Sequence, residues 1–362
     1  MSTTINFSPF TSIFENKTAG TIIIGKPGAG KSFFLLNLAA NALMFEQRLF
    51  VIDPKDDMSV LANIYDGIEV IDINDIKPGG LNPFKVIKDI DTNTLSSIVS
   101  IICGGLTDDQ IIAITPILND FINKNRRLNM NLSFSDVVDY LYANDNIEAQ
   151  AIGTKLQIHR DSKYGPLLFE NNETEETGLK SNSTIISLHG MDLPKGQSGS
   201  MTEEQKFNSA IVFIVCKMLK DVLTQGKYPT LFILDEAHIA YQNESFSRII
   251  DELLVLGRSL NIAVVLASQS TSHYPEGISQ LVSSKFCFNS STDDATDFIE
   301  KFYNKDFDGM ADFDSIVYEI GQFETGNVFF IDSNNRTGIF KVTSLLGDDI
   351  TSNPLMKKRN KE

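Results

Sequence analysis

The sequence predicts an α/β fold with a mostly parallel central sheet and an inserted all-helical lobe. The first observation behind this prediction is a strand–helix–strand succession within residues 21–54, which is the pattern of a βαβ unit. The second is a series of helical patterns from about residue 92 to 165, after which strand patterns return at residue 183. A chain of 362 residues is also long enough to bury a full core around such a sheet.

The first part of the α/β domain is assigned to residues 1–91. Runs of β-branched and apolar residues predict strands at 21–25 and 48–54, and the segment between them, 31–44, predicts a helix. Parallel strands joined through a helix require helices on the faces of the sheet. The stretch "GGLNPF" at 79–84 predicts a turn, after which the character of the sequence changes.

The inserted lobe is assigned to residues 92–180. Two of its helices are expected to begin with a capping box, at 107–110 and 133–136, where a Thr or Ser precedes a Gln or Asp by three residues. An acidic, polar loop at 170–183 is expected to follow the helices. The lobe therefore interrupts the α/β domain without contributing a strand to it.

The second part of the α/β domain is assigned to residues 181–346, and residues 347–362 are expected to form a polar tail. A capping box at 202–205 predicts the start of a long helix that ends near Gly226. A further helix is expected to run through residue 259. Strands are predicted at 183–188, 230–238, 262–270 and 285–288, and a hairpin at 326–342.

The overall charge disfavours a protein that holds nucleic acid over its whole surface. The chain has 31 Lys and Arg residues against 47 Asp and Glu residues, which gives a formal net charge of −16. Proteins that grip phosphate backbones broadly carry the opposite balance. A small basic pore loop is compatible with this charge, so DNA remains an alternative partner that the composition does not favour.

Cysteine and histidine spacing indicates neither a disulfide framework nor a zinc site, which fits a reducing cytoplasm. No apolar run approaches the roughly 18 residues needed to span a bilayer, and the amino terminus lacks a signal-peptide pattern. We therefore expect a cytoplasmic protein without a membrane span of its own, which would reach a membrane only through partners.

The segment "GKPGAGKS" at 25–32 satisfies the pattern G-x-x-x-x-G-K-[ST] between a predicted strand and a predicted helix. Glycines in such a loop let successive backbone N–H groups point at phosphate oxygens, and the helix amino terminus adds partial positive charge. Lys31 is expected to reach the β- and γ-phosphates of ATP, and Ser32 to ligate Mg²⁺. The residues expected to bind the nucleotide are Gly25, Lys26, Pro27, Gly28, Ala29, Gly30, Lys31, Ser32 and Phe33.

Two adjacent acids lie at the tip of the buried strand predicted at 230–238. Asp235 comes after four apolar residues and is expected to hold Mg²⁺ together with Ser32. Glu236 is expected to polarise the attacking water, because an acid directly after this aspartate faces the γ-phosphate in P-loop ATPases of this class. The alternative is that Glu236 only caps the amino end of the next helix.

Gln269 lies just past the strand at 262–267, where its amide can hydrogen-bond both a water and a γ-phosphate oxygen; the alternative is a plain polar strand end. Arg258 follows Gly257 at a helix end, where it either stabilises a transferring phosphoryl group or complements the helix dipole. Arg336, in the predicted hairpin, is a second candidate for stabilising the phosphoryl group, and it also fits a solubilising role.

Asp53 and Lys55, just past the second strand, lie at the sheet edge where ligands bind, although such residues mostly solvate a turn.

Taken in order, the motifs resemble those of the FtsK/HerA superfamily of hexameric ATPases, which implies a RecA-like P-loop ATPase fold. The segments that carry the resemblance are "GKPGAGKSFF", "FVIDPKDD", "LNPF", "LFILDEAH", "LGRSLNIAVVLASQS" and "FFIDSNNRTGIFKV". The "NPF" turn and the late D-x-x-x-R-T-G hairpin are most similar to the motor ATPases of conjugation and type IV secretion, the VirB/TraC/TraE kind. The resemblance covers roughly residues 15–345 and corresponds to the motor domain only.

This resemblance implies roles at matching positions. Lys31 and Ser32 match the Walker A motif, Asp235 and Glu236 match Walker B, and Gln269 matches the sensor glutamine. Arg258 matches the "G-R" that serves in the related coupling ATPases as an arginine finger across the subunit interface. Catalysis would then need a second copy of the chain.

The expected function is Mg²⁺-dependent ATP hydrolysis that powers substrate transfer or pilus assembly in a conjugative type IV secretion system. The expected partners are further copies of the chain, in a homo-hexamer or dynamic oligomer, together with secretion-channel proteins and a coupling ATPase at the inner face of the membrane. The first alternative is a coupling protein or translocase that pumps DNA. The second is a P-loop switch or assembly scaffold, for which Glu236 would be dispensable.

Overall fold

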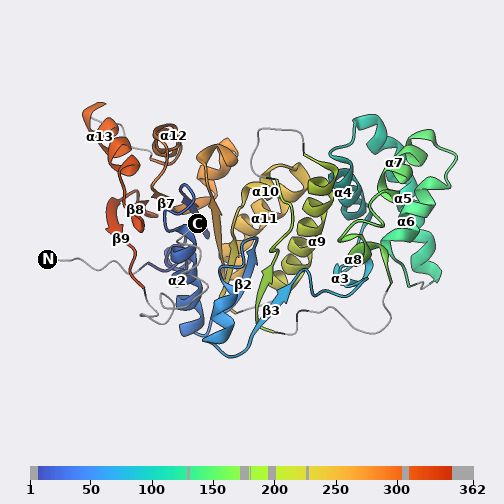
Figure 1. Ribbon diagram of the computed structural model, residues 1–362, viewed down its shortest axis with the longest axis horizontal. Helices are drawn as coiled ribbons and strands as arrows, with labels where there is room; N and C mark the ends of the chain where they lie inside the picture. The colour runs from blue at the N-terminus through green and yellow to red at the C-terminus, as the bar shows by residue number, and fades with distance from the viewer. Residues whose placement is uncertain are drawn as a thin grey trace.

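The computed structural model consists of a central sheet with helices on both faces and a helical lobe at one end (Figure 1). The residues that the structure describes are 7–128, 131–171, 179, 181–194, 201–225, 228–303 and 310–344. The predicted α/β fold with an inserted all-helical lobe is confirmed. The predicted polar tail and most of the predicted acidic loop lie outside the described residues.

The sheet within the described residues has nine strands in the order β3-β4-β2-β5-β6-β1-β7-β8-β9. All neighbours from β3 to β7 are parallel, and β8 and β9 extend the sheet as an antiparallel hairpin. The bounds are β1 Gly20–Ile24, β2 Arg48–Asp53, β3 Ile68–Asp72, β4 Ser183–Ser187, β5 Thr230–Leu234, β6 Ile262–Ser268, β7 Val282–Phe288, β8 Asn327–Ile331 and β9 Thr337–Lys341.

Five helices, α4 to α8, form the lobe between β3 and β4, and the remaining longer helices cover the sheet (Figure 1). The helices are α1 Thr11–Phe14, α2 Lys31–Met44, α3 Pro83–Val86, α4 Thr92–Cys103, α5 Asp108–Leu128, α6 Phe134–Tyr142, α7 Ile147–Gln157, α8 Gly165–Phe169, α9 Glu203–Gln225, α10 His238–Tyr241, α11 Glu244–Leu260, α12 Thr292–Phe302 and α13 Met310–Gly321. The predicted box at Thr107 and Gln110 is present, with each backbone N–H donating to the other residue's side chain.

The central strands form where the sequence has continuous apolar runs. In β1, β5 and β6 every residue is buried, as expected for parallel strands covered by helices on both faces. The edge strand β3 is different, because all five of its residues are at least partly exposed and Glu69 and Asp72 interrupt its apolar pattern. For this reason β3 is not among the predicted strands, and the helices α12 and α13 are additional to the prediction as well.

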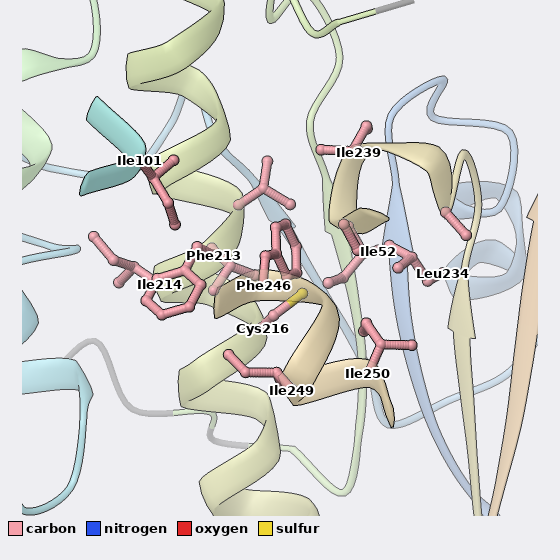
Figure 2. Close-up of a cluster of buried hydrophobic side chains, with 14 of the residues drawn as sticks. Ile52, Ile101, Phe213, Ile214, Cys216, Leu234, Ile239, Phe246, Ile249 and Ile250 are labelled. Atoms are coloured by element: carbon pink, nitrogen blue, oxygen red, sulfur yellow. The ribbon is translucent and has the colours of Figure 1, made fainter. Parts of the chain in front are cut away.

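Each face of the sheet carries its own core. On one face α2 packs through Phe34, whose ring lies 4.9 Å from that of Phe286 on β7. The opposite face packs against α9 and α11, and its core continues through α4 into the lobe. Figure 2 shows part of this second core, where Phe213 on α9 meets Phe246 on α11 edge to face at 5.9 Å. The lobe is thus joined to the sheet through shared apolar packing.

Among the described residues, no helix combines the length and the apolar character that a membrane crossing requires.

Candidate nucleotide-binding and catalytic site

The candidate site lies at the carboxyl edge of four adjacent strands, β2, β5, β6 and β1. The register places Ile52, Leu234 and Leu266 side by side, and Ile24 pairs with Ser268. The residues that follow these positions therefore emerge together at one edge, which is where ligands bind in parallel α/β sheets. The P-loop, the two acids, Gln269 and the turn after β2 meet here.

The P-loop follows β1 in an arrangement that its glycines permit. Gly30 has a φ of +109°, and a Cβ on it would lie 3.0 Å from the backbone nitrogen of Gly326. A Cβ on Gly25 would lie 2.7 Å from the Cβ of Phe288, which no ordinary packing allows. The loop is fixed from behind, since Lys26 N donates to the carbonyl of Asn289 at 2.9 Å.

Lys31 begins α2 and folds back over the loop, with only 5% of its surface exposed. Its ammonium donates to the carbonyl of Gly25 and, at 3.2 Å, to that of Lys26. Burial lowers the pKa of Lys31 to about 8, and the charge of Lys55 adds to this effect while the nearby acids oppose it. Ser32, the next residue, lies half-buried in the first turn of α2.

Asp235 is fully enclosed at the tip of β5, with 1% of its surface exposed. One carboxylate oxygen, Oδ1, accepts a hydrogen bond from the backbone N–H of Glu236 at 3.0 Å. The other, Oδ2, is buried and accepts no hydrogen bond from the described residues; it lies 3.9 Å from Nζ of Lys55. Burial raises the pKa of Asp235 to about 6, while Lys55 acts in the opposite direction.

Glu236 is contacted by three polar side chains. Its Oε1 accepts from Nε2 of Gln269 at 2.8 Å and from Nζ of Lys55 at 2.5 Å. Its Oε2 lies 3.2 Å from Nδ1 of His238, whose Nε2 donates to the carbonyl of Pro194 at 2.6 Å. Burial acts to raise the pKa of Glu236, but His238, Lys55 and Gln269 together hold it well below its usual range.

The backbone at Glu236 is unusual, because its φ of +58° is in the left-handed region that non-glycine residues rarely adopt. Such a conformation costs of order 1–3 kcal/mol and persists only where surrounding contacts enforce it. Here the side-chain contacts of Glu236 and the hydrogen bond from Ala237 N to the carbonyl of Ala267 at 2.7 Å hold the turn. The chain thereby aims the carboxylate across the ends of β5 and β6.

The turn after β2 contributes more than the sequence indicates. Asp53 is fully buried and shapes the turn by accepting from the backbone N–H groups of Met58 at 2.7 Å and Lys55 at 3.1 Å. Burial raises the pKa of Asp53 to about 7. The side chain of Lys55 then reaches both Asp235 and Glu236, and although burial opposes the change, these acids raise its pKa.

The two candidate arginines do not join this cluster. Arg258 is exposed in the last turn of α11, where its Nη1 donates to the carbonyl of Asn16 at 3.0 Å. Arg336 is in the turn between β8 and β9, where its Nε donates to Asp332 Oδ2 at 2.6 Å, and 75% of its side chain is exposed.

Both arginines lie toward the amino-terminal edge of the sheet, away from the P-loop. Asn16 precedes β1 and the P-loop follows it, so the five extended residues of β1, about 16 Å, separate the two. Lys17, next to Asn16, donates to the carbonyl of Ser333 at 2.7 Å, which places the turn of Arg336 near the same end. Neither arginine can therefore serve the P-loop of its own chain in this conformation.

Two residues of the site are missing from the sequence-based prediction, and a third is only a minor candidate in it. His238 behind Glu236 and Asn289 behind the P-loop carry no recognisable motif of their own. Lys55 is predicted only as a weak candidate, although one signal for it exists. It lies two residues past β2, which pairs with β5 in the sheet, so its side chain can reach the acids at the end of β5.

These observations define a P-loop domain with a RecA-like fold. Residues 14–350 match the model of the AAA-like domain family, and the chain belongs to this family. The match spans nearly all of the described residues, including both parts of the sheet and the lobe. Comparison with curated protein sequences gives no significant match.

Solved structures agree with the family assignment. VirB4 of Thermoanaerobacter pseudethanolicus superposes with a TM-score of 0.73 at 16% identity, over 92% of this chain and 91% of that one. The bacterial conjugative coupling protein TrwBdeltaN70 gives 0.59 at 16% identity, over 90% of this chain and 84% of that one. The predicted resemblance to the conjugation and secretion ATPases is thus confirmed in the fold.

Proposed function

We propose that this chain binds ATP and Mg²⁺ and hydrolyses ATP to power substrate transfer or pilus assembly in a conjugative type IV secretion system. The observation that carries the proposal is the meeting of Lys31, Asp235, Glu236 and Gln269 at one sheet edge. A lysine for the phosphates, an acid for the metal and a carboxylate for the water are what phosphoryl transfer to water requires.

The residues present fit a magnesium ion. Oδ2 of Asp235 is a buried carboxylate oxygen without a hydrogen-bond donor among the described residues, and Mg²⁺ prefers such oxygen ligands. Asp235 and the hydroxyl of Ser32 would hold the ion, with substrate phosphates completing its ligands. When bound, Mg²⁺ supplies neutralisation of the charge on the β- and γ-phosphate oxygens.

Relatives of the same fold support both the ligand and the setting. TrwB has been solved with the ATP analogue ADPNP and with ADP and Mg²⁺, at TM-scores of 0.58. VirB4 superposes with a higher TM-score than TrwB and over more of its own chain. This difference favours the secretion motor over the coupling protein, and it agrees with the net charge of −16.

Arg258 is proposed to act on the nucleotide of a neighbouring copy. Its position beyond the opposite end of β1 leaves no path to its own P-loop, whereas a ring of head-to-tail copies would place it against the next site. A guanidinium there would stabilise charge on the transferring phosphoryl group. The proposed assembly is a homo-hexamer or dynamic oligomer, held in the cytoplasm at the inner face of the membrane by secretion-channel proteins and a coupling ATPase.

Steady-state ATP turnover across a protein concentration series, with and without DNA, tests the proposal. Turnover per chain is expected to rise with protein concentration and to be unchanged by DNA. Lys31→Ala serves as the blank, since the variant loses the phosphate-binding ammonium. Intact turnover in Lys31→Ala would overturn the proposal.

The second candidate is a DNA-pumping coupling protein, which the fold shared with TrwB favours. It predicts turnover that DNA raises strongly and that added salt lowers, since phosphate contacts weaken as salt increases. The third candidate is a P-loop switch or scaffold without hydrolysis. Loss of turnover in Glu236→Gln with nucleotide binding retained would exclude it.

A further inference from the structure

We propose that Lys55 is shared between Glu236 and the terminal phosphate of ATP: it holds the carboxylate when no triphosphate is bound and moves to the γ-phosphate when one is. This inference rests on the proposed function and adds a residue outside the Walker motifs to it. In this role Lys55 contacts substrate, and its departure from Glu236 frees an oxygen of that carboxylate for the attacking water.

The ammonium of Lys55 lies close to both acids of the site. Nζ of Lys55 lies 2.5 Å from Oε1 of Glu236 and 3.9 Å from Oδ2 of Asp235. It is also close enough to lower the pKa of Lys31 by its charge. The ammonium therefore lies between the phosphate-binding lysine, the metal-binding acid and the water-activating acid. A terminal phosphate on which all three act must occupy the same neighbourhood.

The charges supply the reason for movement. In the structure, Asp235 and Glu236 face the two lysines, Lys31 and Lys55. A divalent cation held by Asp235 would offset the attraction that Asp235 exerts on Lys55, and its positive charge would disfavour the ammonium at this position. The γ-phosphate oxygens offer a more negative partner than the carboxylate of Glu236 alone, so the ammonium gains by changing partners.

Lys55 can move more freely than Glu236. Glu236 is 5% exposed and fixed by a strained backbone, by Gln269 and by the ring of His238. Lys55 has 39% of its side chain exposed and reaches the site on a flexible four-carbon stem. The lysine is thus the member of the pair that can move while the carboxylate remains in position.

The freed oxygen matters for the reaction. Oε2 of Glu236 is buried against the ring of His238 and is closed to water. Oε1 accepts from both Lys55 and Gln269, so the water that Glu236 is proposed to polarise has no open site on that oxygen either. Moving Lys55 leaves Gln269 in place and opens one acceptor position. ATP binding and activation of the carboxylate are thereby coupled through one side chain, and ADP, which lacks the terminal phosphate, would not trigger the change.

A double-mutant cycle measured by calorimetry tests this coupling without using hydrolysis. The dissociation constants of Mg²⁺-ADPNP and Mg²⁺-ADP are compared for the full chain, Lys55→Met, Glu236→Gln and the double variant. Lys55→Met is expected to weaken ADPNP binding about tenfold, from one lost charge-assisted contact, and to change ADP binding less than about twofold. In the Glu236→Gln background the loss is expected to be larger, because the competing carboxylate is gone.

The opposite pattern would overturn the inference. If Lys55 only neutralises Glu236, its removal weakens ADPNP binding through an uncompensated negative charge, and this effect disappears in Glu236→Gln. Lys220→Met is the matched control, since Lys220 forms an ion pair with Glu252 on the surface, and thermal melting of each variant checks its folding. If the unaltered chain binds neither nucleotide, the proposed function fails; if it binds both and the Lys55 effect vanishes in Glu236→Gln, only this inference fails.

Discussion

The two edges of the sheet carry different halves of one proposed reaction. At the carboxyl edge, residues that follow three strands converge: Asp235, Glu236 and Gln269 contact one another or Lys55, and the charges of both acids act on Lys31. At the amino-terminal edge, Arg258 is exposed and contacts a backbone carbonyl. The acids at the first edge are buried and held in place by neighbouring side chains, which is how a site is pre-organised, and Oδ2 of Asp235 has no hydrogen-bond donor among the described residues. The cation at the second edge is available to a neighbour.

If Arg258 acts between copies as proposed, a single copy would bind nucleotide well and hydrolyse it slowly. The groups that hold phosphates and metal are all supplied by one chain at its carboxyl edge. The guanidinium that would stabilise the transition state is at the far end of β1, about 16 Å away along the strand. Hydrolysis would then depend on the assembly of several copies, so that ATP would be hydrolysed only by the oligomer.

The largest effect is expected at the carboxyl edge of the sheet, for Glu236→Gln. The amide keeps the shape of the side chain but cannot accept a proton, so kcat should fall by about 10²–10⁴-fold. Binding of Mg²⁺-ADPNP should be retained, because Lys31, Ser32 and Asp235 are unchanged. Stopped-flow turnover and calorimetry on the same preparation check both outcomes, and unaltered kcat would assign Glu236 to helix capping alone.

Arg258→Ala is expected to have an effect of similar size on kcat. Loss of an arginine finger lowers kcat by about 10³-fold or more, whereas nucleotide affinity of the isolated chain should change little. Titration with Mg²⁺-ADPNP at low protein concentration and turnover at high concentration separate these two quantities. A helix-end cation with no catalytic role would leave kcat within about twofold of the unaltered chain and lower only the melting temperature.

A smaller effect is expected when pH changes the charge of Lys31 at the carboxyl edge and with it the affinity for nucleotide. Burial lowers the pKa of Lys31 from 10.5 to about 8, so the ammonium is present below pH 8 and is lost from the nucleotide-free protein above it. Above this pH the protein must take up a proton to bind phosphate, and affinity for Mg²⁺-ADPNP should fall about tenfold per pH unit. Calorimetry from pH 6.5 to 9.5 measures this slope. Lys31→Arg, which stays charged, should show a flat profile.

The smallest effect is expected for Arg336→Ala at the amino-terminal edge. Its side chain is 75% exposed and paired with Asp332 within the same turn, a geometry that contributes about 0–1 kcal/mol to stability. Turnover should stay within about threefold of the unaltered chain at the concentration where Arg258→Ala is inactive. A loss as large as that of Arg258→Ala would make Arg336 the finger instead.

The local parts of the site could be predicted from the sequence, because each is contained in a short stretch. The P-loop needs only its glycines, Lys31 and Ser32 between a strand and a helix, and the bounds of α2 agree with the predicted helix at 31–44. Asp235 and Glu236 follow a short, continuous apolar run, which is typical of a buried parallel strand. Parallel strands then bring such ends to one edge without further information.

The remaining parts depend on which strands are neighbours. Lys55 and Glu236 are 181 residues apart, and their contact follows from the pairing of β2 with β5, which no local pattern states. The strand β3 escapes prediction because it is a partly exposed edge strand. The helix α12 does carry a signal, a cap in which Ser291 accepts from the backbone of Asp294, but the segment has a polar composition.

The position of Arg258 relative to the P-loop also lies outside what spacing can predict. Sequence places it eleven residues before Gln269, which is at the nucleotide edge. The structure shows that α11 runs antiparallel to the strands and delivers Arg258 to the opposite edge. The direction of α11 decides at which edge of the sheet Arg258 lies, and therefore whether it could reach the P-loop of its own chain or only that of a neighbouring copy.

The most direct test of this divided site mixes two inactive variants, Arg258→Ala and Glu236→Gln. If the site is shared between copies, an Arg258→Ala chain supplies an intact carboxyl edge and its Glu236→Gln neighbour supplies the arginine. An equal mixture should then recover up to about a quarter of the unaltered turnover, the fraction of interfaces with the productive order. Turnover that stays at the mean of the two separate variants, under conditions where both assemble, would contradict the account.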